Sequence, residues 1–253
     1  MMYAWTVVVS LFMAQSAADV YQQANAQFQQ RNLEAALITV EQALRLDAHF
    51  VPALILKARL EMASSHLDDA QRDLEAALAA DSKQSYPRFL LGFLFYLKND
   101  FERARDTLAA ADPNDARVTF YRAMTEEALG NGEAAAAQYE RTLRLDKSAS
   151  EPRVAYARLL FSLRRLDRGE AVIDEALKIE PNGRDALYEK GRCLFERRAY
   201  VQAADFGERS LAVAQGSTTE REIRYLLVRA YLAAGNRAMA DKHRAVFEKL
   251  PAR

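Results

Sequence analysis

The chain has 253 residues, half of them hydrophobic, and its 35 lysines and arginines balance its 35 aspartates and glutamates. This balance argues against a nucleic-acid partner and against an anionic membrane surface, because both attract proteins with a surplus of basic charge. The one cysteine, Cys193, excludes an internal disulfide and a zinc site built from thiolates. Its neighbours are apolar, so we expect a small buried hydrophobe here, with a reactive thiol as the alternative.

The first 18 residues differ from the rest of the chain. Residues 5–13 are apolar and uncharged, and small residues follow up to Ala18, directly before Asp19. This order is typical of a secretory signal peptide, although no Lys or Arg precedes Arg31, and the run is too short to span a bilayer. We therefore expect residues 1–18 to be the leader of an exported, periplasmic protein. The alternative is an apolar cap on the first helices of a cytoplasmic protein.

From residue 19 onward the sequence repeats with a period of 34 residues. Three columns of mostly small residues carry the repeat: Ala24, Ala58, Gly92, Ala123, Ala157, Gly191 and Val228; Ala36, Ala70, Ala104, Ala135, Gly169, Ala203 and Ala240; Ala43, Ala77, Ala111, Thr142, Ala176, Ser210 and Phe247. All three columns share a short spacing of 31 across residues 112–114 and a long spacing of 37 across residues 214–219. Columns that share their gaps are not a by-product of alanine-rich composition, so the repeat is real.

Each repeat predicts two helices joined by a short polar or glycine-containing turn. Apolar residues recur at helical spacing on both sides of the turn, as at Ala70 and Leu74. Pro52, Pro87 and Pro152 fall in the first turn of the expected helices, where a missing N–H costs nothing. We expect a single solenoid over residues 19–253, with units at about 17–50, 51–84, 85–115, 116–149, 150–183, 184–220 and 221–253.

On these columns the chain resembles the tetratricopeptide repeat (TPR) proteins, of the bacterial, exported scaffold or adaptor kind. The period matches, as do the small residues at positions eight, twenty and twenty-seven of each unit. The tryptophan that the family carries at position four is absent, and bulky apolar residues hold position five instead. The resemblance implies an all-α, right-handed superhelical solenoid of about seven helix–turn–helix repeats. It also implies that a partner protein or peptide binds in a concave groove lined by the first helix of each unit.

No pattern in the sequence points to chemistry. No two of the three histidines, His49, His66 and His243, have metal-ligand spacing, and we expect each to be a solvated surface residue. No glycine-rich phosphate loop and no serine-nucleophile motif occurs. We therefore expect a protein that is not an enzyme, without a cofactor, a metal or an integral membrane span.

Side chains at positions two, six, nine and thirteen of each first helix share one face, which in the family points into the groove. The partner-binding residues expected on this face are Arg59, Tyr86, Leu90, Phe93, Leu97, Tyr121, Met124, Arg158, Arg192 and Arg229. Residues 88–97 are apolar on all sides, so Phe93 forms either an aromatic patch with Tyr121 or part of an ordinary buried helix. A chaperone-type carboxylate clamp is not expected, because position five never carries lysine.

The leader and the apolar centre of the groove favour one function over two others. We expect an exported protein–protein interaction scaffold that assists the assembly of a cell-envelope complex. One alternative is a structural protein that self-associates through its C-terminal repeat. The other is a cytoplasmic regulatory subunit of an enzyme complex.

Overall fold

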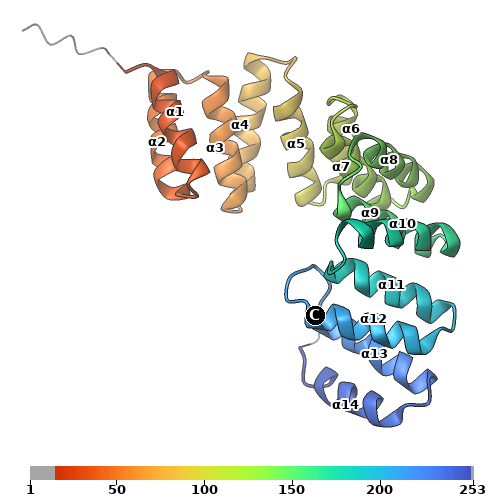
Figure 1. The fold of residues 1–253 in the computed structure, drawn as a ribbon. Helices are drawn as coiled ribbons and strands as arrows, with labels where there is room; N and C mark the ends of the chain where they lie inside the picture. The colour runs from red at the N-terminus through yellow and green to blue at the C-terminus, as the bar shows by residue number, and fades with distance from the viewer. Residues whose placement is uncertain (1–14, 252–253) are drawn as a thin grey trace, which may run out of the picture. The chain divides into compact units, whose positions relative to one another are not determined.

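The computed structural model describes residues 15–251, and this part of the chain is helical without any strand (Figure 1). Its fourteen helices form seven consecutive pairs. The first helices of the pairs are α1 (Ala17–Gln29), α3 (Val51–Ala63), α5 (Ser85–Leu97), α7 (Ala116–Ala128), α9 (Ser150–Ser162), α11 (Arg184–Glu196) and α13 (Glu220–Ala233). The second helices are α2 (Leu33–Leu46), α4 (Leu67–Ala80), α6 (Phe101–Ala109), α8 (Gly132–Leu145), α10 (Leu166–Ile179), α12 (Tyr200–Ala212) and α14 (Arg237–Phe247). Six first helices begin at the predicted start of their unit and α13 begins one residue earlier, which confirms the all-α repeat architecture.

The three predicted columns of small residues lie where helices pack against each other. All their members in the first six repeats are buried. Gly92 shows how close the helices come, because a Cβ atom there would lie 2.6 Å from the side chain of Leu108 on α6. Only Val228 and Phe247, in the last repeat, are half-buried. No later helix packs against them within residues 15–251.

The helices divide into two compact units between Asp112 and Pro113, and each unit is described by itself. The N-terminal unit contains α1 to α6, and the C-terminal unit contains α7 to α14. The boundary falls in the predicted short connector, where α6 has nine residues while α2 has 14. Ala111, a member of the third column, therefore lies just beyond the end of its helix. A single solenoid over the whole length stays a prediction.

Every helix pair turns through one residue with a positive φ. These residues are Arg31, Ser65, Asn99, Gly130, Arg164, Arg198 and Gly235, with φ between 58° and 81°. Only two are glycines, although a left-handed conformation costs other residues about 1–2 kcal/mol. Six of the turns lie where the sequence predicts them. The turn at Arg198 was not predicted, although it lies 34 residues after the turn at Arg164 and so follows the period.

The predicted apolar run at residues 5–13 lies outside the described residues. Helix α1 begins at Ala17, and Ser16 caps it. The Ser16 hydroxyl accepts a hydrogen bond from the Asp19 backbone N–H at 3.2 Å, and the Asp19 carboxylate accepts one from the Ser16 N–H at 3.1 Å. Within residues 15–251, none of the helices has the length and apolar character that crossing a membrane requires.

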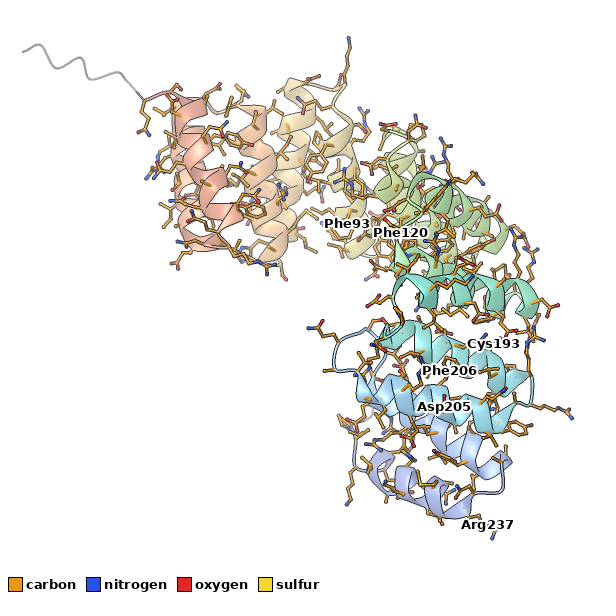
Figure 2. The ribbon with its side chains drawn as sticks, in the orientation of Figure 1. Phe93, Phe120, Cys193, Asp205, Phe206 and Arg237 are labelled. Atoms are coloured by element: carbon orange, nitrogen blue, oxygen red, sulfur yellow. The ribbon has the colours of Figure 1, made fainter. Side chains whose placement is uncertain are left out.

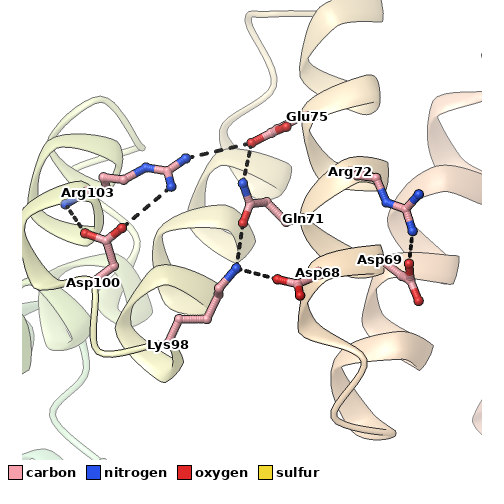
Figure 3. A network of polar contacts seen from close by, with 8 residues as sticks. All are labelled: Asp68, Asp69, Gln71, Arg72, Glu75, Lys98, Asp100 and Arg103. Atoms are coloured by element: carbon pink, nitrogen blue, oxygen red, sulfur yellow. Dashed lines mark hydrogen bonds and ion pairs between the residues drawn. The ribbon is translucent and has the colours of Figure 1, made fainter.

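Polar contacts tie neighbouring repeats together on the surface (Figure 3). In the N-terminal unit, the Lys98 ammonium at the end of α5 donates to Asp68 at 2.7 Å and to Gln71 at 2.9 Å, both on α4. In the C-terminal unit, Arg165 pairs in the same way with Glu133 of the preceding repeat at 2.6 Å. Such exposed pairs contribute about 0–1 kcal/mol each to the stability of the fold. They therefore make only a small addition to the buried columns, which already hold neighbouring repeats together.

The left-handed turns predict opposite effects for two substitutions in the C-terminal unit. Arg198→Gly relieves strain at φ 62° and is expected to raise the free energy of unfolding by about 0.5–1 kcal/mol. Gly130→Ala introduces a side chain at φ 80° with no heavy atom within 4 Å of the new Cβ, so backbone strain alone is expected to lower it by about 1 kcal/mol. Urea unfolding followed by circular dichroism measures both. Equal stability of Arg198→Gly and the parent chain would show that this turn stores no strain.

Candidate binding surface

The first helices of the C-terminal unit pack in chain order and form one surface, called here the first-helix face. Phe120 of α7 shares a buried cluster with Leu159 of α9, and Leu194 of α11 shares one with Leu227 of α13. Helices α9 and α11 are also in contact, which completes the row. Several cavities open on the C-terminal unit. Cys193 lines one of them and Phe120 lines two others (Figure 2), the smaller of which lies at the starts of α7 and α9 and has a volume of about 350 Å³.

The larger cavity, called here the loop cleft, has a volume of about 410 Å³. Phe120, Met124 and Val154 give it an apolar lining, and Arg158 stands at its edge. Residues 215–217, from the connector between α12 and α13, form the opposite wall. Met124 and Arg158 are both residues expected from the sequence to face a partner. The wall was not foreseen, although the long 37-residue spacing marked the insertion that forms it.

The connector of residues 213–219 is held in place by the first two residues of α11. The Asp185 carboxylate accepts hydrogen bonds from the Ser217 N–H at 2.9 Å, the Ser217 hydroxyl at 3.0 Å and the Thr218 N–H at 2.6 Å. The Arg184 guanidinium donates to the first carbonyl of the connector at 2.6 Å. Burial raises the pKa of Asp185, but the hydrogen bonds from Thr218 and Ser217 outweigh it and hold the pKa below its ordinary value. The wall of the cleft is therefore a fixed part of the structure.

The second cavity, called here the arginine pocket, has a volume of about 300 Å³. Arg192 of α11 and Arg229 of α13 line it together with Phe195, Cys193 and other residues of α9, α11 and α13. The Arg229 guanidinium lies over the Phe195 ring, 4.3 Å from its centroid. A guanidinium stacked in this way keeps its charge and its outward N–H donors available to a ligand.

Glu189 of α11 lies in the first-helix face and is only 4% exposed. Its carboxylate pairs with Arg192 at 2.9 Å. Burial raises the pKa of Glu189, and the charges of Arg192 and Arg158 partly oppose that shift. Arg158 and Arg229 form no ion pair with a carboxylate in the described part of the chain. Of the three position-nine arginines in the C-terminal unit, only Arg192 therefore forms an ion pair within the described residues.

The remaining expected site residues are Tyr86, Leu90, Phe93 and Leu97 on α5, Arg59 on α3 and Tyr121 on α7. Arg59 is half-buried, with its guanidinium 4.4 Å from the centroid of the Phe28 ring. On α5, Leu90 is 6% exposed, Tyr86 and Phe93 are half-buried, and Leu97 is 42% exposed. Neighbouring helices therefore bury much of this apolar helix. Tyr121 belongs to the other compact unit, and a patch that joins it to Phe93 stays a prediction.

The expectation that all three histidines are solvated is wrong for His243, which is 3% exposed. Its Nε2 lies 2.8 Å from a Glu208 carboxylate oxygen, and its Nδ1 lies 3.1 Å from the Arg224 guanidinium. Because arginine only donates, Nδ1 accepts and Nε2 carries the proton. Tyr231 stacks on the ring at 5.7 Å. A histidine among charged neighbours in the last helix looks solvated in the sequence, because its partners lie on two other helices, α12 and α13.

Two other expectations have clear outcomes. His49 and His66 are exposed, as predicted. Cys193 is 1% exposed, and burial raises the pKa of its thiol, which confirms the expected buried hydrophobe over the reactive alternative.

Glu189 and Asp185 predict opposite dependences of stability on pH. The folded chain holds a proton on Glu189 more tightly than the unfolded chain does, so this residue makes the fold less stable as pH rises through 4.5 and then through its raised pKa. The stability of Glu189→Gln relative to the parent is therefore expected to increase over that range. Asp185→Asn is expected to be less stable than the parent chain above pH 3.8, because the folded pKa of Asp185 is lowered. This difference in the free energy of unfolding is expected to shrink as pH falls through 3.8 and below. Urea unfolding at several pH values tests both, and parallel profiles for the two variants would contradict the assignment.

Comparison with known proteins identifies the family. The tetratricopeptide repeat model matches residues 55–116, 98–152 and 154–218, well over half of the chain, while a search of curated proteins finds no match. PilF of Pseudomonas aeruginosa is similar in structure, with a TM-score of 0.71 and 20% identity over 79% of this chain and 93% of that one. A chain of the APC/C hetero-tetramer Cut9–Hcn1 has a TM-score of 0.73 and 15% identity, over 87% of this chain and 44% of that one. YrrB, described as a TPR protein with an unusual peptide-binding site, has a TM-score of 0.58 and 16% identity, over 78% of this chain and 97% of that one. The chain belongs to the tetratricopeptide repeat family.

Proposed function

We propose that this protein is an adaptor that binds a partner protein or peptide on the first-helix face of its C-terminal unit. Proteins with the TPR fold generally mediate protein–protein interaction. The observation that carries the proposal is the loop cleft lined by Arg158 together with the arginine pocket lined by Arg229, two arginines that form no ion pair within the described residues. Apolar surface next to arginine and aromatic side chains is the composition of interface positions that contribute most to binding.

The likeness to YrrB supports a peptide as one form of the partner, since that protein is described by its peptide-binding site. The aromatic residues of α5 are a second candidate surface, in the N-terminal unit, and Tyr121 of α7 is a further candidate in the C-terminal unit. We include Phe93 and Tyr121 because each is half-buried and keeps part of its ring accessible. Their role in binding is part of the proposal.

The finer proposal is that the protein is exported and assists the assembly of a cell-envelope complex. The apolar run at residues 5–13 and the small residues before Asp19 support an exported location. The fold is compatible with any compartment, so the location rests on these residues alone.

Charge reversal on the first-helix face is expected to reduce partner recovery. In a crosslinked pull-down, the double variant Arg158→Glu plus Arg229→Glu should recover at least tenfold less of the partner than the parent chain, because two guanidinium donors are replaced by repelling carboxylates. The matched control is Arg144→Glu plus Arg237→Glu, which reverses two exposed charges on the second helices α8 and α14 (Figure 2). Equal losses in both variants would mean that net charge alone governs recovery.

The aromatic part of the surface is tested in the same pull-down with Phe93→Glu plus Tyr121→Glu. Partner recovery is expected to fall while the helical circular dichroism signal is kept. Unchanged recovery with intact folding would remove these two residues from the proposed surface.

Mass spectrometry of the mature N-terminus tests the proposed export. A chain that begins near Asp19 is expected, and it would also lack Ser16 and therefore the N-terminal cap of α1. An intact Met1 would instead indicate a cytoplasmic protein and would contradict the proposed export. That result would leave the binding proposal standing, because the first-helix face belongs to the other unit.

A further inference from the structure

The loop cleft depends on a feature that the other repeats lack. Most connectors between repeats have four residues, as between α10 and α11, whereas residues 213–219 insert three more. The backbone and hydroxyl groups of Ser217 and Thr218 are anchored on Asp185. Gly216 has a φ of 151°, and a Cβ there would lie 2.8 Å from the Arg184 side chain, so the connector packs tightly on α11. The insertion therefore converts an open stretch of the first-helix face into a walled cleft.

The charges around the cleft are unevenly distributed. Glu151 and Arg158 both line it and lie seven residues apart on α9, which separates their backbones by about 10 Å at 1.5 Å per residue. Arg184 also lines the cleft, but its guanidinium is bound to the connector, so Glu151 and Arg158 mark two ends of opposite charge. Beyond the basic end the row of arginines continues through Arg192 to Arg229 on α13. Two other acids line the cleft: Asp185, which is occupied by the connector, and Glu180, which directly follows α10.

Spacing limits the shape of a ligand that meets both unneutralised arginines. Helices α9, α11 and α13 pack as neighbours, and packed helices lie about 8–10 Å apart. Arg158 and Arg229 are therefore about 16–20 Å apart along the row. An extended chain covers that distance in about five or six residues, at about 3.3 Å per residue.

From these observations we propose that the loop cleft seats one apolar side chain of an extended acidic segment in the partner. Carboxylates of that segment, about five or six residues apart, pair with Arg158 and Arg229. The acidic residues follow the apolar residue on the side of Arg158 and not on the side of Glu151. This inference rests on the proposed function, because it names the chemistry of the ligand that the same face would bind.

Selection from a random library of twelve-residue displayed peptides on the full immobilised chain tests the inference. The expected consensus is an aliphatic or aromatic residue followed on one side by two acidic residues about five or six apart. Selection on Arg158→Glu is expected to replace the nearer acidic residue by a basic one. Selection on the control Arg144→Glu, which changes an exposed charge on α8, is expected to return the parent consensus.

A second pair of variants tests the cleft itself. Gln215 lines the cleft, and Gln215→Trp is expected to fill it, so that a fluorescein-labelled peptide of the parent consensus binds at least tenfold more weakly in fluorescence polarisation. Gln202→Trp, at an exposed position of α12, is the matched control and should bind like the parent. Thermal melts by circular dichroism establish that both variants fold.

The outcomes separate the inference from the proposed function. Peptides that bind but are basic, or that bind equally well to Arg158→Glu and Gln215→Trp, would overturn the acidic ligand and its seat in the cleft while leaving a peptide-binding protein. Failure to enrich any peptide on the parent chain would overturn both.

Discussion

Paired helices in this protein approach so closely that positions eight, twenty and twenty-seven of the first six repeats hold only alanine, glycine, serine or threonine. Each buried column satisfies a local contact between neighbouring helices, and no contact needs a distant part of the chain. A fixed repeat length then places equivalent positions of successive first helices in rows. The arginines at position nine, Arg158, Arg192 and Arg229, form such a row because the columns beneath them are in register.

A solenoid of identical repeats presents the same surface along its whole length, so a specific site needs a departure from the period. The two departures in this chain have different consequences. The short spacing shortens α6 and coincides with the boundary between the compact units. The long spacing changes the flanking helices α12 and α13 by only one residue each and adds a connector that Arg184 and Asp185 hold against α11. Only the second departure builds a wall beside side chains that a partner could contact.

The helices and their pairing could be predicted almost completely from the sequence. Positions buried between close helices accept only small residues, and these residues therefore recur with the period of the repeat. Features that depend on one repeat alone leave no such periodic pattern. His243 is buried by partners on α12 and α13, which no local pattern around residue 243 reveals. The loop cleft was therefore predicted only in part. Met124 and Arg158 were expected because they follow the period, whereas residues 215–217 were not, because they lie in the segment that interrupts it.

The buried carboxylate of Glu189 decides which of the three arginines meets a ligand. Taking Arg192 away from Glu189 would leave a carboxylate that is 4% exposed without its ion pair, and an unpaired buried charge destabilises a protein. A ligand carboxylate that competed for Arg192 would have to break that ion pair, whereas Arg158, whose charge also acts on Glu189, and Arg229 form no ion pair within residues 15–251. Glu189 thus keeps Arg192 in an ion pair. Arg158 on α9 and Arg229 on α13 remain as the two binding positions, with α11 between them. A short acidic motif that reaches only one of them would gain a single charged contact, so this face favours an extended segment long enough to reach both.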